Sequence, residues 1–132
     1  MEILDNNGNI LGLYISSEKY KPGKNFLTSH NSEFQAGTFN LVKGEKILNH
    51  VHLQQKRRIV NTSEAITVLA GKIKVNFYSE EKEYITSVLV TSGETIILIN
   101  GGHGIDIIED SKFIEIKQGP FFEKLDKSLF HD

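Results

Sequence analysis

Apolar and polar residues alternate along several short stretches of this chain, as they do in β-strands that bury one face. The clearest stretch is residues 72–77, where Ile73, Val75 and Phe77 alternate with two lysines and an asparagine. The stretch from Thr95 to Ile99 is instead apolar at successive positions. It predicts a strand that is buried on both faces, as in a closed or double-layered sheet.

Turn residues separate these stretches. Asn7-Gly8 lies between two apolar pairs and predicts a hairpin turn that joins two short strands. Further strands are expected at residues 39–41, Ile47–Leu53, Tyr84–Thr91, 105–108 and 113–116. The stretch from Lys21 to Glu33 contains a proline, a glycine and several small polar residues, so we expect it to be irregular.

Short strands spaced about every 8–12 residues predict an all-β sandwich or barrel. A chain of 132 residues has room for one domain with one core. We therefore expect a single domain over residues 1–132, with a barrel core at about 37–119, an N-terminal hairpin at 1–16 and a tail at 120–132. Only the tail has helical spacing, at Phe122, Leu125 and Leu129, and we expect it to pack on the barrel.

Composition removes several classes of partner and ligand. The net charge is -2, from 15 basic and 17 acidic residues, which gives no overall reason to bind nucleic acid or an anionic membrane. The chain has no cysteine, so a bound metal would have to use imidazole and carboxylate ligands. The N-terminus lacks the pattern of a secretory signal, and the longest aliphatic run is too short to span a bilayer, so we expect a cytoplasmic protein.

His50 and His52 are the first candidate metal ligands. In a strand, residues i and i+2 face the same way, so the predicted strand Ile47–Leu53 would present both imidazoles to one ion. Taken alone, such a pair more often marks polar residues on the solvent side of a sheet. The pair therefore needs further ligands before it indicates a metal site.

Glu64 and His103 are those further candidates. Glu64 would share its face with Ile66 and Val68, and a carboxylate on an apolar face is costly to bury unless a cation pairs with it. His103 lies between glycines, which let the backbone turn sharply. Three histidines and a glutamate from separate strands suit a divalent ion such as Fe, Mn, Ni, Co or Zn.

A basic run, Lys56-Arg57-Arg58, lies in the eleven residues between His52 and Glu64. Most charge runs are solvated loops, and that interpretation stays open here. The alternative is that Arg57 or Arg58 holds a phosphate or carboxylate of a substrate, because guanidinium groups bind both in a bidentate manner.

The spacing of these residues resembles that of the cupin superfamily. The first cupin motif, with five residues before the His-X-His pair and six after the glutamate, is matched by Gly44, His50, His52, Glu64 and Gly71. The second motif is matched by Gly93, Gly101 and His103. The resemblance covers about residues 37–119.

This resemblance implies a double-stranded β-helix, the jelly-roll barrel of cupins, with one divalent metal inside. His50, His52, His103 and Glu64 would be its ligands. It further implies a small polar ligand, for which the Arg57-Arg58 run indicates an anionic group. Sugar or nucleotide-sugar metabolism of the surface-polysaccharide type is the first hypothesis, and the family includes isomerases, epimerases, lyases and dioxygenases. Alternatives are a metal-free sugar epimerase with histidine as base, and a non-catalytic binding module. Cupin barrels often pair, so we expect a homodimer.

Overall fold

The computed structural model describes residues 1–16, 18 and 20–131. This part of the chain contains ten short strands and one four-residue helix, which confirms the all-β expectation. The strands belong to two compact units: one combines residues 1–17 with 61–132, and the other holds residues 18–60. No helix in the described ranges is long and apolar enough to cross a membrane.

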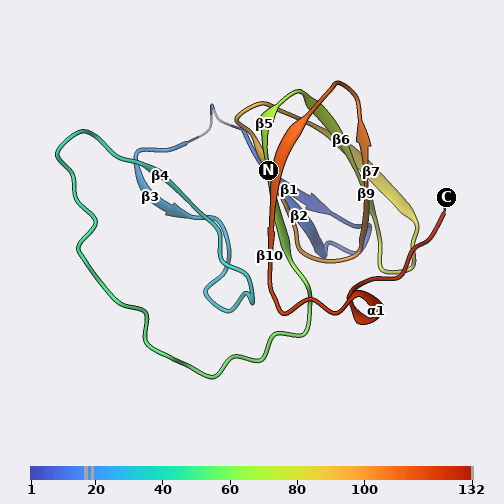
Figure 1. The fold of residues 1–132 in the computed structure, drawn as a ribbon, viewed down its shortest axis with the longest axis horizontal. Coiled ribbons are helices and arrows are strands. Elements are labelled where there is room, and N and C mark those ends of the chain that lie inside the picture. Colours follow the sequence, from blue (N-terminus) through green and yellow to red (C-terminus); the bar gives the residue numbers. More distant parts are fainter. Residues whose placement is uncertain (17, 19, 132) are drawn as a thin grey trace. The chain divides into compact units, whose positions relative to one another are not determined.

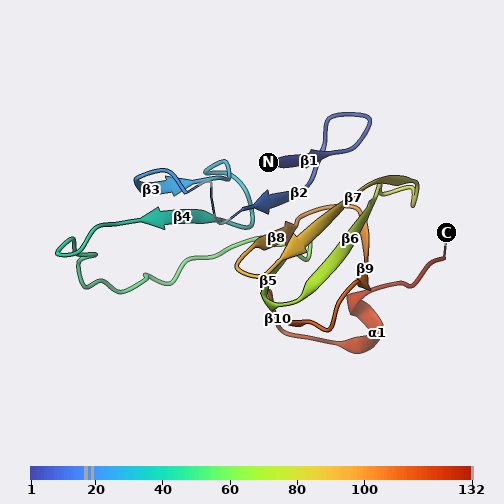
Figure 2. The same cartoon turned by 90° about the horizontal axis from the view of Figure 1, so that it is seen from above.

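The first unit contains two antiparallel sheets (Figure 1). The five-stranded sheet has the order β1 (Glu2–Leu4), β2 (Ile10–Ile15), β8 (Thr95–Leu98), β5 (Glu64–Ala70) and β10 (Lys112–Lys117). The three-stranded sheet has the order β7 (Tyr84–Thr91), β6 (Lys72–Tyr78) and β9 (Gly102–Ile107). Figure 2 shows β6 and β7 side by side. Together with a two-stranded sheet in the second unit, the described strands form three antiparallel sheets and no closed barrel.

One apolar cluster takes its side chains from both sheets. Ile66 of the larger sheet and Ile73, Val75 and Phe77 of the smaller one are buried in it. The alternation read from residues 72–77 is therefore confirmed. The prediction for the Thr95–Ile99 stretch is also confirmed over the residues of β8, where the successive residues Ile96, Ile97 and Leu98 are all buried.

Glycine is needed at two points of this unit. Gly12 of β2 lies against the core, and a Cβ there would come 2.8 Å from the Phe77 ring and would collide with the Ile97 carbonyl oxygen. Gly71 is the one residue between β5 and β6, and its φ of 87° lies in the left-handed region that other residues rarely adopt. The sharp turn at Gly71 connects the two sheets.

The second unit contains a single antiparallel hairpin, β3 (Gly23–Phe26) with β4 (Gly37–Asn40). The Phe26 and Phe39 rings meet edge to face across it, with centroids 6.3 Å apart. The expectation that Lys21 to Glu33 is irregular is therefore wrong at β3. Pro22 and Gly23 lie at the start of β3, where Gly23 adopts a φ of 85° before the strand continues to Phe26.

The predicted strand Ile47–Leu53 is also wrong, because residues 45–60 form no strand. Alternation shows how side chains divide between two faces, but a strand also needs a neighbouring backbone to bind its N–H and C=O groups. Leu48, Val51 and Leu53 are exposed to more than 70%. His50 and His52 therefore lie on an extended segment without a ladder.

The tail forms only the short helix α1 (Glu123–Asp126). Leu125 and Leu129 remain more than 80% exposed, so the expected packing through these residues is wrong. The helix has no side-chain cap at its N-terminus, and four residues are too few for a stable helix on their own. Phe130 packs instead, with its ring perpendicular to that of Tyr78 at 5.0 Å.

Candidate functional site

Glu64 and His103 meet at one end of the first unit. Glu64 begins β5, and His103 lies opposite Phe77 in the β6–β9 ladder, so each side chain shares the inner face of its own sheet. The Glu64 Oε2 atom is 3.3 Å from the His103 Nε2 atom. The Glu64 side chain is 11% exposed and that of His103 is 33% exposed. The fold therefore brings together a buried carboxylate and an imidazole that is accessible to a ligand.

The inner face of β10 adds two charged residues to this end. Lys117 lies directly opposite Glu64 in the β5–β10 ladder, and Glu115 lies opposite Ile66, diagonally across from Glu64. The Lys117 Nζ atom is 3.8 Å from the Glu64 Oε1 atom. We call Glu64, His103, Glu115 and Lys117 the charged cluster.

The pKa values of the two carboxyl groups in the charged cluster are shifted in opposite directions. A hydrogen bond from His103 holds the pKa of Glu64 below its usual value, against burial, which acts to raise it. Burial raises the pKa of Glu115, and the negative charge of Glu64 raises it further. Glu64 is therefore the ionised member of the pair, and Glu115 is the one that keeps a proton more readily.

Lys117 connects the charged cluster to the tail. Its Nζ atom is 3.2 Å from the Asp126 Oδ2 atom of α1 and 4.9 Å from the centre of the Phe121 ring. The hydrogen bond to Asp126 raises the pKa of Lys117 above its usual value. The side chains of Lys117 and Asp126 are 23% and 13% exposed, so this ion pair is largely withdrawn from solvent.

His50 and His52 form a pair in the second unit. Both residues are exposed, and their rings meet edge to face with centroids 5.2 Å apart. The His50 Nδ1 atom is 2.8 Å from the Leu48 carbonyl oxygen. A carbonyl oxygen can only accept, so it assigns the proton of the neutral ring to Nδ1 and leaves the Nε2 lone pair available to a ligand.

The four residues expected to bind a metal thus lie as two pairs, one in each unit. The part of the chain that the structure describes contains no group of three or more histidine, aspartate or glutamate side chains placed to hold a metal ion. Arg57 and Arg58 are exposed and lie in the same segment as the histidine pair. Within the described ranges neither guanidinium forms an ion pair, which keeps both interpretations of the basic run open.

Sequence reasoning missed Glu115, Lys117 and Asp126. The signal for the first two was present, because charged residues alternate with Ile114 and Ile116 along β10. In the structure, Glu115 and Lys117 lie on the face of Glu64, while Ile114 and Ile116 are 49% and 62% exposed.

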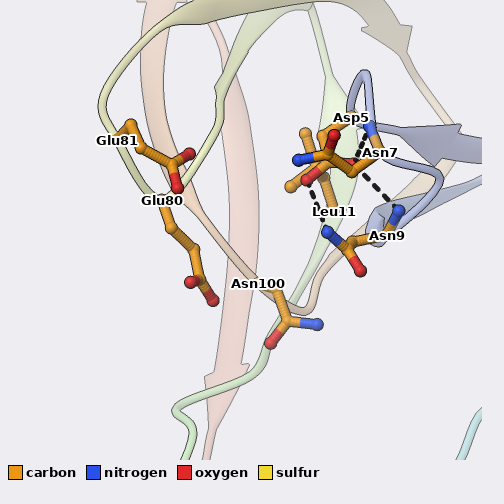
Figure 3. Close-up of a pocket in the computed structure, with 7 residues that line it drawn as sticks. All are labelled: Asp5, Asn7, Asn9, Leu11, Glu80, Glu81 and Asn100. Carbon is orange, nitrogen blue, oxygen red and sulfur yellow. Dashed lines mark hydrogen bonds between the residues drawn. The ribbon is translucent and has the colours of Figure 1, made fainter.

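A separate pocket of about 210 Å³ lies beside the Asn7-Gly8 turn (Figure 3). It is lined by Asp5, Asn7, Asn9, Leu11, Glu80, Glu81 and Asn100. The Asp5 carboxylate accepts hydrogen bonds from the Asn7 and Asn9 backbone and from the Asn9 side chain, at 2.8–2.9 Å. The Asn9 side chain is the main cause that lowers the pKa of Asp5. This carboxylate stabilises the turn, and the pocket shares no residue with the charged cluster.

Comparisons of this chain with protein-family models, with curated proteins and with solved structures found no match.

Proposed function

We propose that this chain is a metal-binding cupin that binds or transforms a small polar, anionic metabolite. His50, His52, Glu64 and His103 are the proposed ligands of one divalent ion, which is Fe, Mn, Ni, Co or Zn. The observation that carries the proposal is the contact between Glu64 and His103. Both residues were selected from the sequence, in which they are distant from each other.

The chemistry of the donor set supports the proposal. Imidazole nitrogen and carboxylate oxygen are suitable ligands for these ions. The buried Glu64 carboxylate is stabilised by its contacts with His103 and with the Lys117 ammonium group, and a divalent ion would act in the same sense. The His50 Nδ1–H donates to a backbone carbonyl, an arrangement that commonly orients the metal-binding histidines of proteins.

The double-stranded β-helix belongs to the same proposal. Two antiparallel sheets that share one apolar core support it, and so does the sharp turn at Gly71, a glycine of the first motif. A closed barrel needs strand pairing beyond the ladders of these two sheets. The homodimer and the cytoplasmic location stay predictions.

In this proposal, Glu64 and His103 hold the reacting part of the ligand at one end of the first unit. A bound ion of this kind supplies Lewis acidity toward a substrate oxygen. The ionised Glu64 balances positive charge there, while the His103 side chain, which is 33% exposed, limits the space open to the ligand. Sugar or nucleotide-sugar metabolism is the first substrate class to test, and it rests on the family resemblance.

A metal-free sugar epimerase is the second candidate, because the same contact has the form of a carboxylate–imidazole dyad. A carboxylate that hydrogen-bonds one nitrogen of a histidine fixes the ring and stabilises the imidazolium ion. Here Glu64 approaches Nε2 of His103, so Nδ1 would have to act as the base toward a sugar proton.

Metal analysis of untagged protein separates these candidates. We expect the purified chain to contain a divalent ion and its melting temperature to rise when metal is added. Glu64→Gln and His50→Ala should each lower metal affinity at least about tenfold. His30→Ala, at an exposed histidine of the second unit, is the matched control and should bind metal like the wild type.

The absence of any ion in the wild type, with no thermal shift on metal addition, would sink the metal proposal. Turnover of nucleotide sugars by that metal-free protein, abolished in His103→Asn, would then establish the epimerase. Binding of such ligands without product, and with an affinity that His50→Ala leaves unchanged, would instead identify a non-catalytic binding module.

A further inference from the structure

Lys117 is the cation of the charged cluster that an anionic ligand would meet. It lies directly opposite Glu64 at the end of β10, and its side chain is 23% exposed. The Phe121 ring lies 4.9 Å from its Nζ atom and restricts where the ammonium group can go. Lys117 therefore presents a fixed positive charge beside the Glu64–His103 contact.

The partner that occupies this charge comes from a weakly held segment. Asp126 is the last residue of α1, a helix of four residues with no buried residue and no side-chain cap. Its neighbour Leu125 is 84% exposed and adds almost no packing. The contact between Asp126 and Lys117 is thus a main attachment of α1 to the sheet.

We infer that Lys117 binds the anionic group of the ligand, and that Asp126 occupies this position while the ligand is absent. The inference rests on the proposed function, in that the charged cluster is the ligand site. The group recognised is a carboxylate or phosphate, and neither motif spacing nor the basic run indicated Lys117. Asp126 competes with the ligand, because both place anionic oxygens on the same ammonium group.

Charge balance at the cluster favours exchange over simple addition. Glu64 already faces His103 and Lys117. An incoming anion that displaces Asp126 replaces one negative charge with another. An anion that bound without displacing Asp126 would meet two carboxylates, those of Glu64 and Asp126, on a single ammonium group.

Calorimetric titration with inorganic phosphate, on the metal-free 132-residue chain at fixed ionic strength, tests the inference. Asp126→Asn should bind phosphate roughly two- to fivefold more tightly than the wild type, the change expected when one competing ion pair is removed. Lys117→Met should lose phosphate binding, and Lys117→Arg should keep it. Glu123→Gln removes the same charge from an exposed position of α1 and should match the wild type.

Results of two kinds would overturn the inference. One is an equal gain in Glu123→Gln and Asp126→Asn, because it would show a general charge effect. The other is unchanged phosphate binding by folded Lys117→Met, or no binding by Asp126→Asn. The metal affinity of Lys117→Met is measured separately. If the chain binds metal normally but Asp126→Asn does not bind phosphate more tightly, the inference fails and the proposed function stands. If Asp126→Asn binds phosphate more tightly but the chain binds no metal, the proposed function fails and the inference stands.

Discussion

Glu64 and Lys117 face each other across the β5–β10 ladder, with 3.8 Å between the Oε1 and Nζ atoms. Lys117 divides its charge between this carboxylate on the sheet and the Asp126 carboxylate on the tail. The sheet and the tail are therefore electrostatically linked through one side chain. A change at any of these three residues is expected to alter how the other two are held.

The raised pKa of Glu115 predicts a dependence of stability on pH. The unfolded chain releases this proton near the usual value of 4.5, whereas the folded protein releases it at higher pH. Stability is therefore lost as pH rises through the interval above 4.5, up to the folded pKa. The stability of Glu115→Gln relative to the wild type should therefore increase between about pH 4 and about pH 7. The increase should be less than about 1 kcal/mol because the residue is exposed. Urea unfolding at both pH values measures it.

Glu64→Gln should show the opposite sign. The pKa of Glu64 is lowered, so its ionised form contributes stability above 4.5, and this contribution disappears as pH falls through the folded pKa. The variant should be less stable than the wild type near neutral pH and approach it in acid. The same urea series provides the comparison, and a parallel response of the two variants would contradict the opposed pKa shifts.

Gly12 should not tolerate a side chain. A methyl group there would lie 2.8 Å from the Phe77 ring, within the buried core. We expect Gly12→Ala to lower the free energy of unfolding by about 1–3 kcal/mol, as overpacked cores do. Gly104→Ala is the matched control, because Gly104 also lies in a strand and nothing is within 4 Å of its added carbon. A control as unstable as Gly12→Ala would point to a general effect of glycine replacement.

The tail should be held by Phe130 more than by its leucines. Phe130 packs edge to face on Tyr78 and lies against Gly102. Phe130→Ala should cost about 0.5–1.5 kcal/mol or more, the range for aromatic pairs. Leu129→Ala should change the free energy of unfolding by less than about 0.5 kcal/mol, since Leu129 is 82% exposed. Chemical denaturation of both variants decides between the two attachments.

The basic run gives a prediction that is independent of Lys117. If Arg57 and Arg58 grip an anion, replacing both by alanine should weaken phosphate binding and leave the metal content unchanged. Calorimetry and elemental analysis of the same sample measure the two quantities. Phosphate affinity equal to that of the wild type would assign both arginines to a solvated loop.

The sequence predicts those features that depend on local pattern. Burial of Ile73 and Val75, and burial of the successive residues of β8, both follow from which positions are apolar. Strand pairing does not follow from it, because the ladder partner of a segment lies elsewhere in the chain. Ile47–Leu53 has the alternation of a strand but no described partner, whereas Gly23–Phe26 has little alternation but pairs with β4.

The candidate site shows the same division. Glu64 was singled out because a carboxylate on an apolar face needs a partner, and His103 is in contact with it. The contribution of β10 was missed because only its apolar residues, Phe113, Ile114 and Ile116, were used to predict the strand. The register that turns Glu115 and Lys117 inward is set by pairing with β5, which residues 112–117 do not encode by themselves.

The turn at Gly71 gives the Glu64–His103 contact a mechanical property. Glu64 lies at the far end of β5 from Gly71, and His103 is paired with Phe77 near the far end of β6. The two strands that leave this turn, β5 and β6, each extend about 20 Å from Gly71 at 3.3 Å per residue. Opening the angle between the sheets by about 5° would separate the far ends of these strands by about 2 Å at that length. A ligand or ion that bridges Glu64 and His103 would therefore fix the angle between the two sheets. A substitution at Gly71 would change the distance between those two residues.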